Sequence, residues 1–393
     1  MRAAAALLAC TVLLTACGGA TADGAKTIAT GLHVPWGLAF EPNGDALVSE
    51  RTTGDIKRIP ARGGTAQTVM HLPDVDTEAG EGGLLGIALS PDYARDGLVY
   101  AYYTTARDNR IVRFRLGGDV EPLITGIAAG SIHDGGRIAF GPDGKLYAGT
   151  GETGNGSLAQ DLGSLNGKIL RMNPDGGVPG DNPFPGSLVW TYGHRNVQGL
   201  AWDRRGRLWS SELGQNRFDE VNLIRKGRNY GWPNVEGRGD TRGGRFTNPV
   251  ATFSTSEASP SGDAVVGNRL FVASLGGESL WRMTIKGTRV SRPKRLYDGR
   301  WGRLRTVARA PDGTLWIATS NTDGRGSPHH GDDHRRDPAL AVADARAGEE
   351  EEPDLERPDT EHDADDDDPL DRAGALAPLG EVLALAAHAA QPG

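Results

Sequence analysis

Four polar residues of the kind that bind a planar anion lie close together in the stretch 191–233. His194, Arg195, Asn196 and Gln198 stand just ahead of an apolar run that is typical of a β-strand. Guanidinium and amide groups make directional, paired hydrogen bonds, so this set at a strand end suits a planar, multiply charged ligand. For any single residue, a solvated loop with incidental charges is the simpler interpretation, but the ordered set favours a binding site.

An acidic pair lies later in the same stretch. Asp219 and Glu220 follow Glu212 and a Gly-containing turn, and the aromatic, Gly-containing segment 229–233 comes after them. Carboxylates beside turns with free carbonyl groups suit a hard cation that prefers oxygen ligands, such as calcium.

The residues that must position these groups belong to a sequence repeat. Six segments share an apolar strand, a turn that is often Pro-Asp-Gly, and a second apolar strand; they start near Pro35, Leu84, Gly135, Val197, Pro260 and Leu304. Spacings of roughly 45–65 residues are typical of propeller blades, each of which buries its faces only against its neighbours. We therefore predict an all-β fold, a six-bladed β-propeller, with a β-sandwich of chance similarity as the alternative.

The two ends of the predicted propeller differ. The run 26–32 is a candidate closing strand that would pair with the last blade and remove a free edge. The sixth blade reads as if it lacks its third strand, so the propeller is assigned to residues 26–333. Residues 334–393 are rich in Ala, Pro, Asp and Glu, which predicts a disordered acidic tail because too little apolar area is available to offset the entropy of ordering. A frameshift and a genuine divergent tail would both produce this pattern.

Residues 1–17 read as a lipoprotein signal peptide. A positive Arg2 and a short apolar run lead to Leu-Thr-Ala-Cys17, which is similar to a bacterial lipobox; an ordinary secretory signal is the alternative. Residues 18–25 would form a tether. We expect an exported protein, anchored by a lipid at Cys17 to the outer face of the bacterial cytoplasmic membrane. Because Cys10 leaves with the signal, no disulfide is expected.

The charge of the chain is unevenly distributed. The formal net charge is −8, and the acidic runs at 349–352 and 365–368 account for much of the negative charge. The propeller region is therefore mildly basic, which suits an anionic ligand. It has no basic stripe with interleaved aromatic residues, so no nucleic-acid partner is expected.

The ordered motifs resemble those of the soluble aldose dehydrogenases that depend on pyrroloquinoline quinone (PQQ), the glucose/sorbosone dehydrogenase family. The resemblance covers roughly residues 32–328, and its carriers are EGGLLGIALSPDY, HDGGRIAFGPDGKLY, YGHRNVQGLAW, ELGQNRFDEVN, NYGWP and GRLRTV. It implies a six-bladed propeller, in agreement with the repeat. It also implies oxidation of the C1 hydroxyl of an aldose to the lactone, with hydride passing to PQQ and then to an unidentified electron acceptor.

The resemblance assigns roles to individual residues. His133 matches the general base that takes the hydroxyl proton, a role that suits imidazole. The residues that match those holding the tricarboxylate quinone are Arg195, Asn196, Gln198, Arg303 and Arg305. Two residues match the ligands of the calcium ion that touches the quinone, which they would bind through their backbone carbonyls: Gly214 and Gln215. The residues that match the ligands of a second, structural calcium ion are Asp219, Glu220 and, through its carbonyl, Tyr230.

Three positions depart from the family pattern. Glu81 stands where a neutral Gln contacts the cofactor, Gly276 where a Lys pairs with the quinone, and Gln215 where a Pro is familiar. Losing the Lys removes a charge-assisted bond to the cofactor.

Two other functions stay open from the sequence. One is a cofactor-free propeller that serves as a binding scaffold at the cell surface. The other is a hydrolase of the lactonase kind, although the cage of Glu, Asn and Asp metal ligands that such an enzyme needs is not evident.

Overall fold

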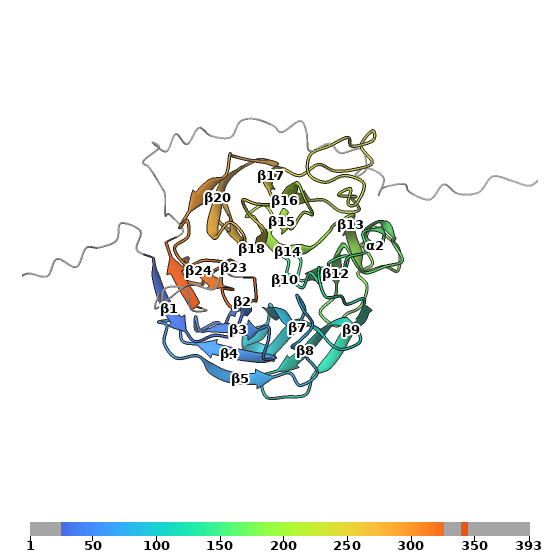
Figure 1. Ribbon diagram of the computed structural model, residues 1–393. Coiled ribbons are helices and arrows are strands. Elements are labelled where there is room, and N and C mark those ends of the chain that lie inside the picture. Colours follow the sequence, from blue (N-terminus) through green and yellow to red (C-terminus); the bar gives the residue numbers. More distant parts are fainter. Residues whose placement is uncertain (1–24, 326–338, 345–393) are drawn as a thin grey trace, which may run out of the picture. The chain divides into compact units, whose positions relative to one another are not determined.

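The strands of the protein form six antiparallel sheets arranged as the blades of a propeller, as predicted (Figure 1). The computed structural model describes residues 25–325 and 339–344. Blade 1 consists of β2 (Pro35–Phe40), β3 (Ala46–Glu50), β4 (Asp55–Ile59) and β5 (Gln67–His71); blade 2 of β6 (Leu84–Leu89), β7 (Leu98–Thr104), β8 (Asn109–Arg115) and β9 (Glu121–Ile127). Blade 3 consists of β10 (Ile138–Phe140), β11 (Leu146–Gly149), β12 (Lys168–Met172) and β13 (Val189–Tyr192); blade 4 of β14 (Val197–Trp202), β15 (Leu208–Glu212), β16 (Phe218–Ile224) and β17 (Ala251–Ser254).

The last two blades are less regular. Blade 5 consists of β18 (Pro260–Val266), β19 (Arg269–Ser274), β20 (Ser279–Lys286), β21 (Arg289–Val290) and β22 (Lys294–Leu296), and both β21 and β22 pair with β20. Blade 6 consists of β23 (Leu304–Arg309), β24 (Leu315–Thr319), β25 (Ala339–Ala343) and, as its outer strand, β1 (Lys26–Thr30). The helices found in residues 25–325 and 339–344 are α1 (Tyr93–Asp96) and α2 (Ser157–Gln160), each a single turn in a connection between strands.

The Pro-Asp-Gly turns of the repeat make tight hairpins. Between β10 and β11, the N–H of Gly141 donates to the carbonyl of Lys145 at 2.9 Å. Asp143 accepts the Lys145 N–H at 3.1 Å through Oδ1, and Gly144 takes a φ of 70°, which is relaxed only for glycine.

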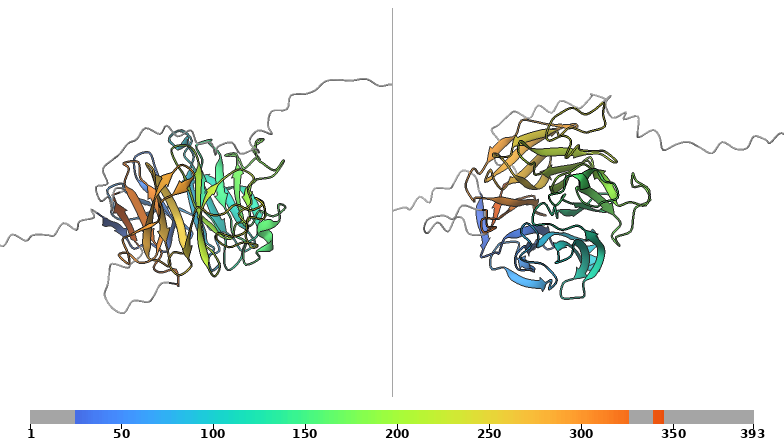
Figure 2. Two further views of the ribbon diagram at one scale, coloured as in Figure 1. Left: turned by 90° about the horizontal axis from the view of Figure 1, so that it is seen from above. Right: turned by 45° about the vertical axis from the view of Figure 1, so that its right-hand side comes forward.

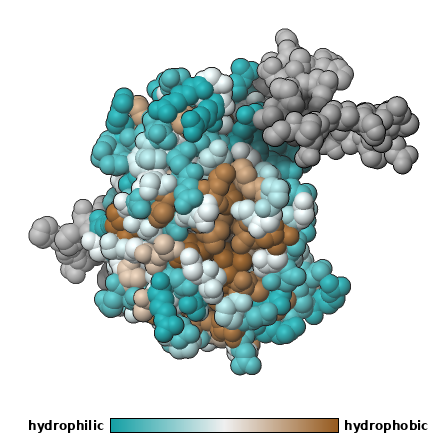
Figure 3. All heavy atoms as spheres, turned by 90° about the vertical axis from the view of Figure 1, so that its right-hand side faces the viewer, coloured by the Kyte–Doolittle hydropathy of each residue, from teal (hydrophilic) through white to brown (hydrophobic). Residues whose placement is uncertain are grey.

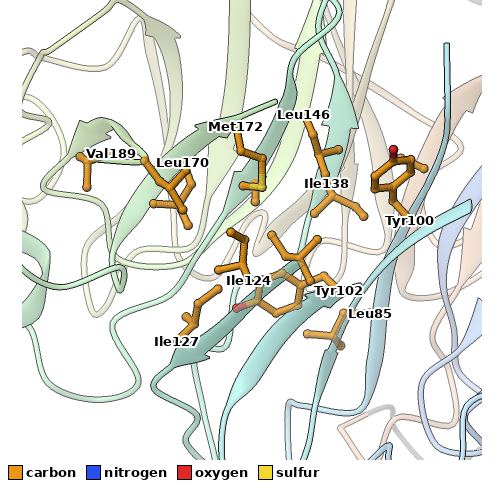
Figure 4. Close-up of a cluster of buried hydrophobic side chains, with 14 of the residues drawn as sticks. Leu85, Tyr100, Tyr102, Ile124, Ile127, Ile138, Leu146, Leu170, Met172 and Val189 are labelled. Carbon is orange, nitrogen blue, oxygen red and sulfur yellow. The ribbon is translucent and has the colours of Figure 1, made fainter. Parts of the chain in front are cut away.

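The core lies between adjacent blades because each strand sends alternate side chains to opposite faces. On β7, Tyr100 and Tyr102 face blade 3, where they join Leu146 and Leu170 in one apolar cluster (Figure 4). The intervening residues, such as Ala101, face blade 1 and belong to a different cluster. Each blade thus completes its core only through its neighbours.

Apolar residues also gather across the middle of one side of the molecule, with polar residues above and below them (Figure 3). Among the described large apolar side chains, Leu162 and Val178 are the ones that are clearly exposed, at 40% and 38%.

The structure corrects the prediction that the sixth blade lacks its third strand. Ala339–Ala343 forms β25, which pairs with β24 on one side and with β1 on the other (Figures 1 and 2). Leu340 and Ala341 are fully buried. The sequence concealed this strand because it consists of small apolar residues and lacks the Arg-plus-aliphatic pattern of the third strands in other blades. The propeller therefore extends past residue 333, and the predicted closing strand is confirmed.

Several predicted segments lie outside the described residues: the signal peptide with Cys17, the tether up to residue 24, and the tail from residue 345. Within the described ranges, no helix is long and apolar enough to cross a membrane.

The first two strands of each blade place their polar end residues at one end of the propeller. The two strands pair antiparallel, so the start of the first strand meets the end of the second strand, as Val197 meets Glu212 and Leu304 meets Thr319. Residues just before β10, β14 and β23 therefore lie at the same end as residues just after β3, β11, β15 and β24.

Candidate functional site

His133 lies at this end, shortly before β10, with a φ of 58° in the sparsely populated left-handed region. Its Nδ1 is 2.5 Å from Oε1 of Glu152, and its Nε2 is 2.9 Å from Nη2 of Arg195. A guanidinium can only donate, so Nε2 must accept, and Nδ1 carries the proton that is donated to Glu152. The contacts therefore select the neutral tautomer with an accepting Nε2.

Arg195 and Asn196 occupy the turn before β14. The Arg195 N–H donates to Oε2 of Glu212 at 2.8 Å, and its Nη1–H donates to the Leu213 carbonyl at 3.1 Å. Asn196 accepts the Gly135 N–H at 3.0 Å through Oδ1. These contacts fix both side chains beside His133 and leave other donors of each available to a ligand.

Gln198 connects this turn to blade 6. Its Oε1 accepts from Nη1 of Arg305 at 2.8 Å and from Oγ of Ser261 at 2.9 Å. Nη2 of Arg303 and Nη2 of Arg305 lie 2.9 and 3.5 Å from the same oxygen of Asp323. The two arginines therefore meet one carboxylate, as expected for residues two apart on a strand.

Several buried N–H groups at the site have no hydrogen-bond partner among the described residues, including Nε of Arg51, Nε of Arg195, Nδ2 of Asn196 and Nε of Arg305. Burial lowers the pKa of the three arginines, that of Arg305 to about 9, and an anion in contact with them would offset this effect. The charge of Glu81 acts in the opposite direction on the pKa of all three arginines, so each of them lies within electrostatic range of this one carboxylate. This donor set fits a tricarboxylate quinone.

A cavity of about 10 Å³, room for a single water molecule or ion, lies beside Arg195. It is lined by Gly193, Arg195, Glu212, Leu213, Gly214, Glu220, Trp232 and Glu236.

Two carboxylates of this cavity are held close together. Nδ2 of Asn222 donates to Oε1 of Glu212 at 2.9 Å and to Oε2 of Glu220 at 3.0 Å. Burial and the charge of Glu212 together raise the pKa of Glu220. Oδ1 of Asn222 is buried and has no donor in the described part of the chain. The two carboxylates are oxygen ligands of the kind that a hard cation prefers, whereas Oδ1 of Asn222 lies on the side of the amide that faces away from them.

The two carboxylates of the predicted acidic pair do not point into one site. Asp219 and Glu220 are successive residues of β16, so their side chains lie on opposite faces. Asp219 uses its two oxygens to accept the N–H groups of Gly214, at 2.8 Å, and of Ser259, at 2.7 Å. Asp219 therefore stabilises the turn that contains Gly214 and Gln215, whose carbonyls are the predicted calcium ligands.

The carbonyls of that turn have a defined direction. Oε1 of Glu236 accepts the N–H of Gln215 at 2.8 Å and that of Asn216 at 2.9 Å. In a trans peptide the carbonyl points opposite to the N–H, so the Gly214 and Gln215 carbonyls point away from Glu236.

Tyr230 is buried beneath the site. Its hydroxyl donates to the Leu223 carbonyl at 2.7 Å, and its ring stacks on His194 with a centroid distance of 4.6 Å. Across residues 25–325 and 339–344, no group of three or more His, Cys, Asp or Glu side chains is arranged to hold a metal ion. A calcium ion would therefore need backbone carbonyls, amide oxygens or water, and the assigned ligands stay predictions.

Sequence reasoning missed several residues of the site. Arg51, Glu152 and Asp323 were not singled out, and Glu212 was noted without a role. Arg51, Glu152 and Glu212 come at or just after the ends of the second strands of blades 1, 3 and 4. Aligning the repeats and comparing these positions would have identified them.

Gly276, which replaces the expected lysine, lies in the turn between β19 and β20. A Cβ atom there would come within 2.8 Å of Oγ of Ser259, so the turn is closely packed without a side chain. The cations of the site come instead from arginines, including Arg51, which the sequence had not indicated.

Comparisons with known proteins agree with this geometry. The aldose sugar dehydrogenase YliI of Escherichia coli strain K12 is 30% identical over 75% of this chain and 89% of its own length. Quinoprotein glucose dehydrogenase B of Acinetobacter calcoaceticus is 34% identical over 59% of this chain, and the match spans only 56% of that relative. The solved structure of the PQQ-bound form of an aldose sugar dehydrogenase from Streptomyces coelicolor is 53% identical, with a TM-score of 0.76 over 81% of this chain and 96% of that one. The family description "Glucose / Sorbosone dehydrogenase" matches residues 32–326. The chain therefore belongs to the glucose/sorbosone dehydrogenase family.

Proposed function

We propose that this protein oxidises the C1 hydroxyl of an aldose to the lactone, using PQQ and calcium, and passes the electrons to an external acceptor. The observation that carries the proposal is the set of buried, unpartnered N–H groups beside a histidine in its accepting tautomer. The PQQ-bound relative at 53% identity supports the choice of quinone.

The cofactor would be held by the arginine and amide side chains that have unpartnered N–H groups at the site. Arg51, Arg195 and Arg305 would supply charge-assisted hydrogen bonds to carboxylates, and Asn196 would supply a neutral donor. When bound, PQQ would accept the hydride from C1, and calcium would polarise its carbonyl as a Lewis acid. Gly214 and Gln215 are the proposed calcium ligands through their carbonyls.

The proton chemistry belongs to His133. Nε2 is the nitrogen that accepts, so it can take the proton of the C1 hydroxyl in place of its contact with Arg195. Glu152 holds the ring orientation through Nδ1 and stabilises the imidazolium that forms. Arg195 stays beside the oxygen from which the proton leaves, where a guanidinium stabilises developing negative charge.

Reconstitution tests the proposal directly. Purified apo-protein should oxidise aldoses with an artificial electron-accepting dye only when both PQQ and Ca²⁺ are added, and neither alone should suffice. A protein that takes up neither PQQ nor Ca²⁺ and oxidises no aldose would contradict the proposal and favour the cofactor-free binding scaffold.

We also propose export with a lipid anchor at Cys17. The full-length protein, expressed in a bacterium, should partition into detergent, and the Cys17→Ser variant should move to the aqueous phase. Equal partitioning of the two would contradict the anchor.

A further inference from the structure

The loop that carries His133 is attached to the loop before β6 by two hydrogen bonds through Glu81. The Glu81 N–H donates to the Ser131 carbonyl at 3.1 Å, and the His133 N–H donates to Oε2 of Glu81 at 2.8 Å. The second bond holds His133 where its φ of 58° is otherwise unfavourable.

The other carboxylate oxygen of Glu81 is bound to blade 6. Its Oε1 lies 2.5 Å from Nη1 of Arg325. The Arg325 N–H donates at 2.9 Å to Oδ1 of Asp323, the residue that pairs with Arg303 and Arg305. The Glu81 side chain is 16% exposed and that of Arg325 57%, so the pair lies at the solvent edge of the site.

The pairing changes the electrostatics of the site. Burial alone would raise the pKa of Glu81, but the His133 N–H and Arg325 lower it overall, so Glu81 is an anion at neutral pH. Released from Arg325, this anion would be drawn to Arg51, Arg195 or Arg305, with which it already interacts. There it would compete with an incoming anionic ligand.

We propose that Glu81 is a positioning residue that holds the backbone of His133, and that Arg325 keeps Glu81 from competing for the arginines that bind the cofactor. The second part rests on the proposed function. The two parts predict different outcomes for different substitutions. Glu81→Ala removes the acceptor for His133, whereas Glu81→Gln keeps one acceptor oxygen for the His133 N–H and replaces the charged oxygen that binds Arg325 with an NH₂ group.

Amide exchange in the apo-protein tests the positioning role without cofactor. With ¹⁵N-labelled histidine, the His133 amide should exchange with solvent at least about tenfold faster in Glu81→Ala and within about threefold of wild type in Glu81→Gln, because an amide oxygen accepts nearly as well. The control is Glu78→Ala, which changes an exposed residue of the same loop and should leave the exchange rate of the His133 amide unaltered. Unchanged exchange in Glu81→Ala would overturn the positioning role. The reconstituted Glu81→Ala enzyme should also lose kcat about tenfold or more while its apo-protein keeps its affinity for PQQ.

Calorimetric titration of PQQ into apo-protein tests the role of Arg325. Arg325→Ala should weaken binding about fivefold or more, and adding Glu81→Gln should restore it to within about twofold of wild type. Arg95→Ala, which breaks the exposed Arg95–Asp92 pair, should change nothing. A double variant as weak as Arg325→Ala would overturn this role. Wild-type apo-protein that binds no PQQ would refute the proposed function and the role of Arg325 together, whereas the exchange data would still decide the contact between Glu81 and His133.

Discussion

Replacing Glu152 by glutamine should disable the proposed base without removing it. The Glu152 side chain is 3% exposed, and its carboxylate accepts the Nδ1–H of His133 at 2.5 Å. Once the substrate hydroxyl has displaced Arg195 from Nε2, a glutamine in the same place can donate its NH₂ group to Nδ1. That arrangement selects the tautomer with its proton on Nε2, which cannot accept the hydroxyl proton.

The size of the effect follows from the loss of this tautomer. General-base catalysis contributes about 10²–10⁴-fold, and imposing the wrong tautomer on the histidine of a serine-protease triad costs about 10⁴-fold. We therefore expect kcat to fall by about 10²–10⁴-fold, equivalent to about 3–5 kcal/mol of transition-state stabilisation. PQQ binding to the apo-protein should not weaken, because the substitution removes a negative charge close to Arg195.

Dye-linked aldose oxidation by the reconstituted enzyme measures the loss, and ¹⁵N chemical shifts of labelled histidine report the tautomer. The matched control is Asp55→Asn, which alters a His–carboxylate pair on the outer strands: His71 lies 2.8 Å from Asp55 and is 58% exposed. The control should keep full activity. A Glu152→Gln enzyme with kcat within threefold of wild type, or with an unchanged His133 tautomer when aldose is bound, would refute the reasoning.

Four further predictions concern the base, the metal, pH and the sixth blade. His133→Gln should lose about 10²–10⁴-fold in kcat yet still bind PQQ, and near-normal turnover would exclude the assigned role. A chelator should lower both activity and melting temperature, and the melting temperature should rise with free Ca²⁺; melting indifferent to both would count against a structural calcium. Burial raises the pKa of Asp134 to about 6 from 3.8. The protonated side chain therefore contributes stability that is full below pH ~4 and is lost as the pH rises through ~6. In urea unfolding, Asp134→Asn should raise the free energy of unfolding above that of wild type by up to about 3 kcal/mol at pH 8 and should leave it unchanged at pH 4. A chain that ends at residue 344 should unfold like the full chain. A chain that ends at residue 338 lacks β25, and its free energy of unfolding should be lower by about 5 kcal/mol or more. Equal unfolding curves for the two truncated chains would contradict the pairing of β25.

The six blades could be predicted from the sequence, and so could several residues of the candidate site. Alternating strands and Pro-Asp-Gly turns depend on residues that are neighbours in the chain, so a repeat of them is legible without a structure. The family resemblance carried by the motifs also indicated His133, Arg195 and the pair Arg303 and Arg305, which the structure places before or on the first strands of blades 3, 4 and 6.

The groups that meet across blades, in contrast, could be identified from the folded chain and not from the sequence. His133 and Arg195 are 62 positions apart, and Gln198 and Arg305 are 107 apart, so neither contact has a local signature. The contacts of Glu81 and Glu152 with His133 were hidden for the same reason, since each joins residues of different loops that only the folded ring brings together. The third strand of blade 6 escaped notice because an alanine-rich segment forms a strand when β24 and β1 offer it backbone partners on both sides. Local patterns encode the elements, whereas closure of the ring brings distant residues within hydrogen-bonding distance.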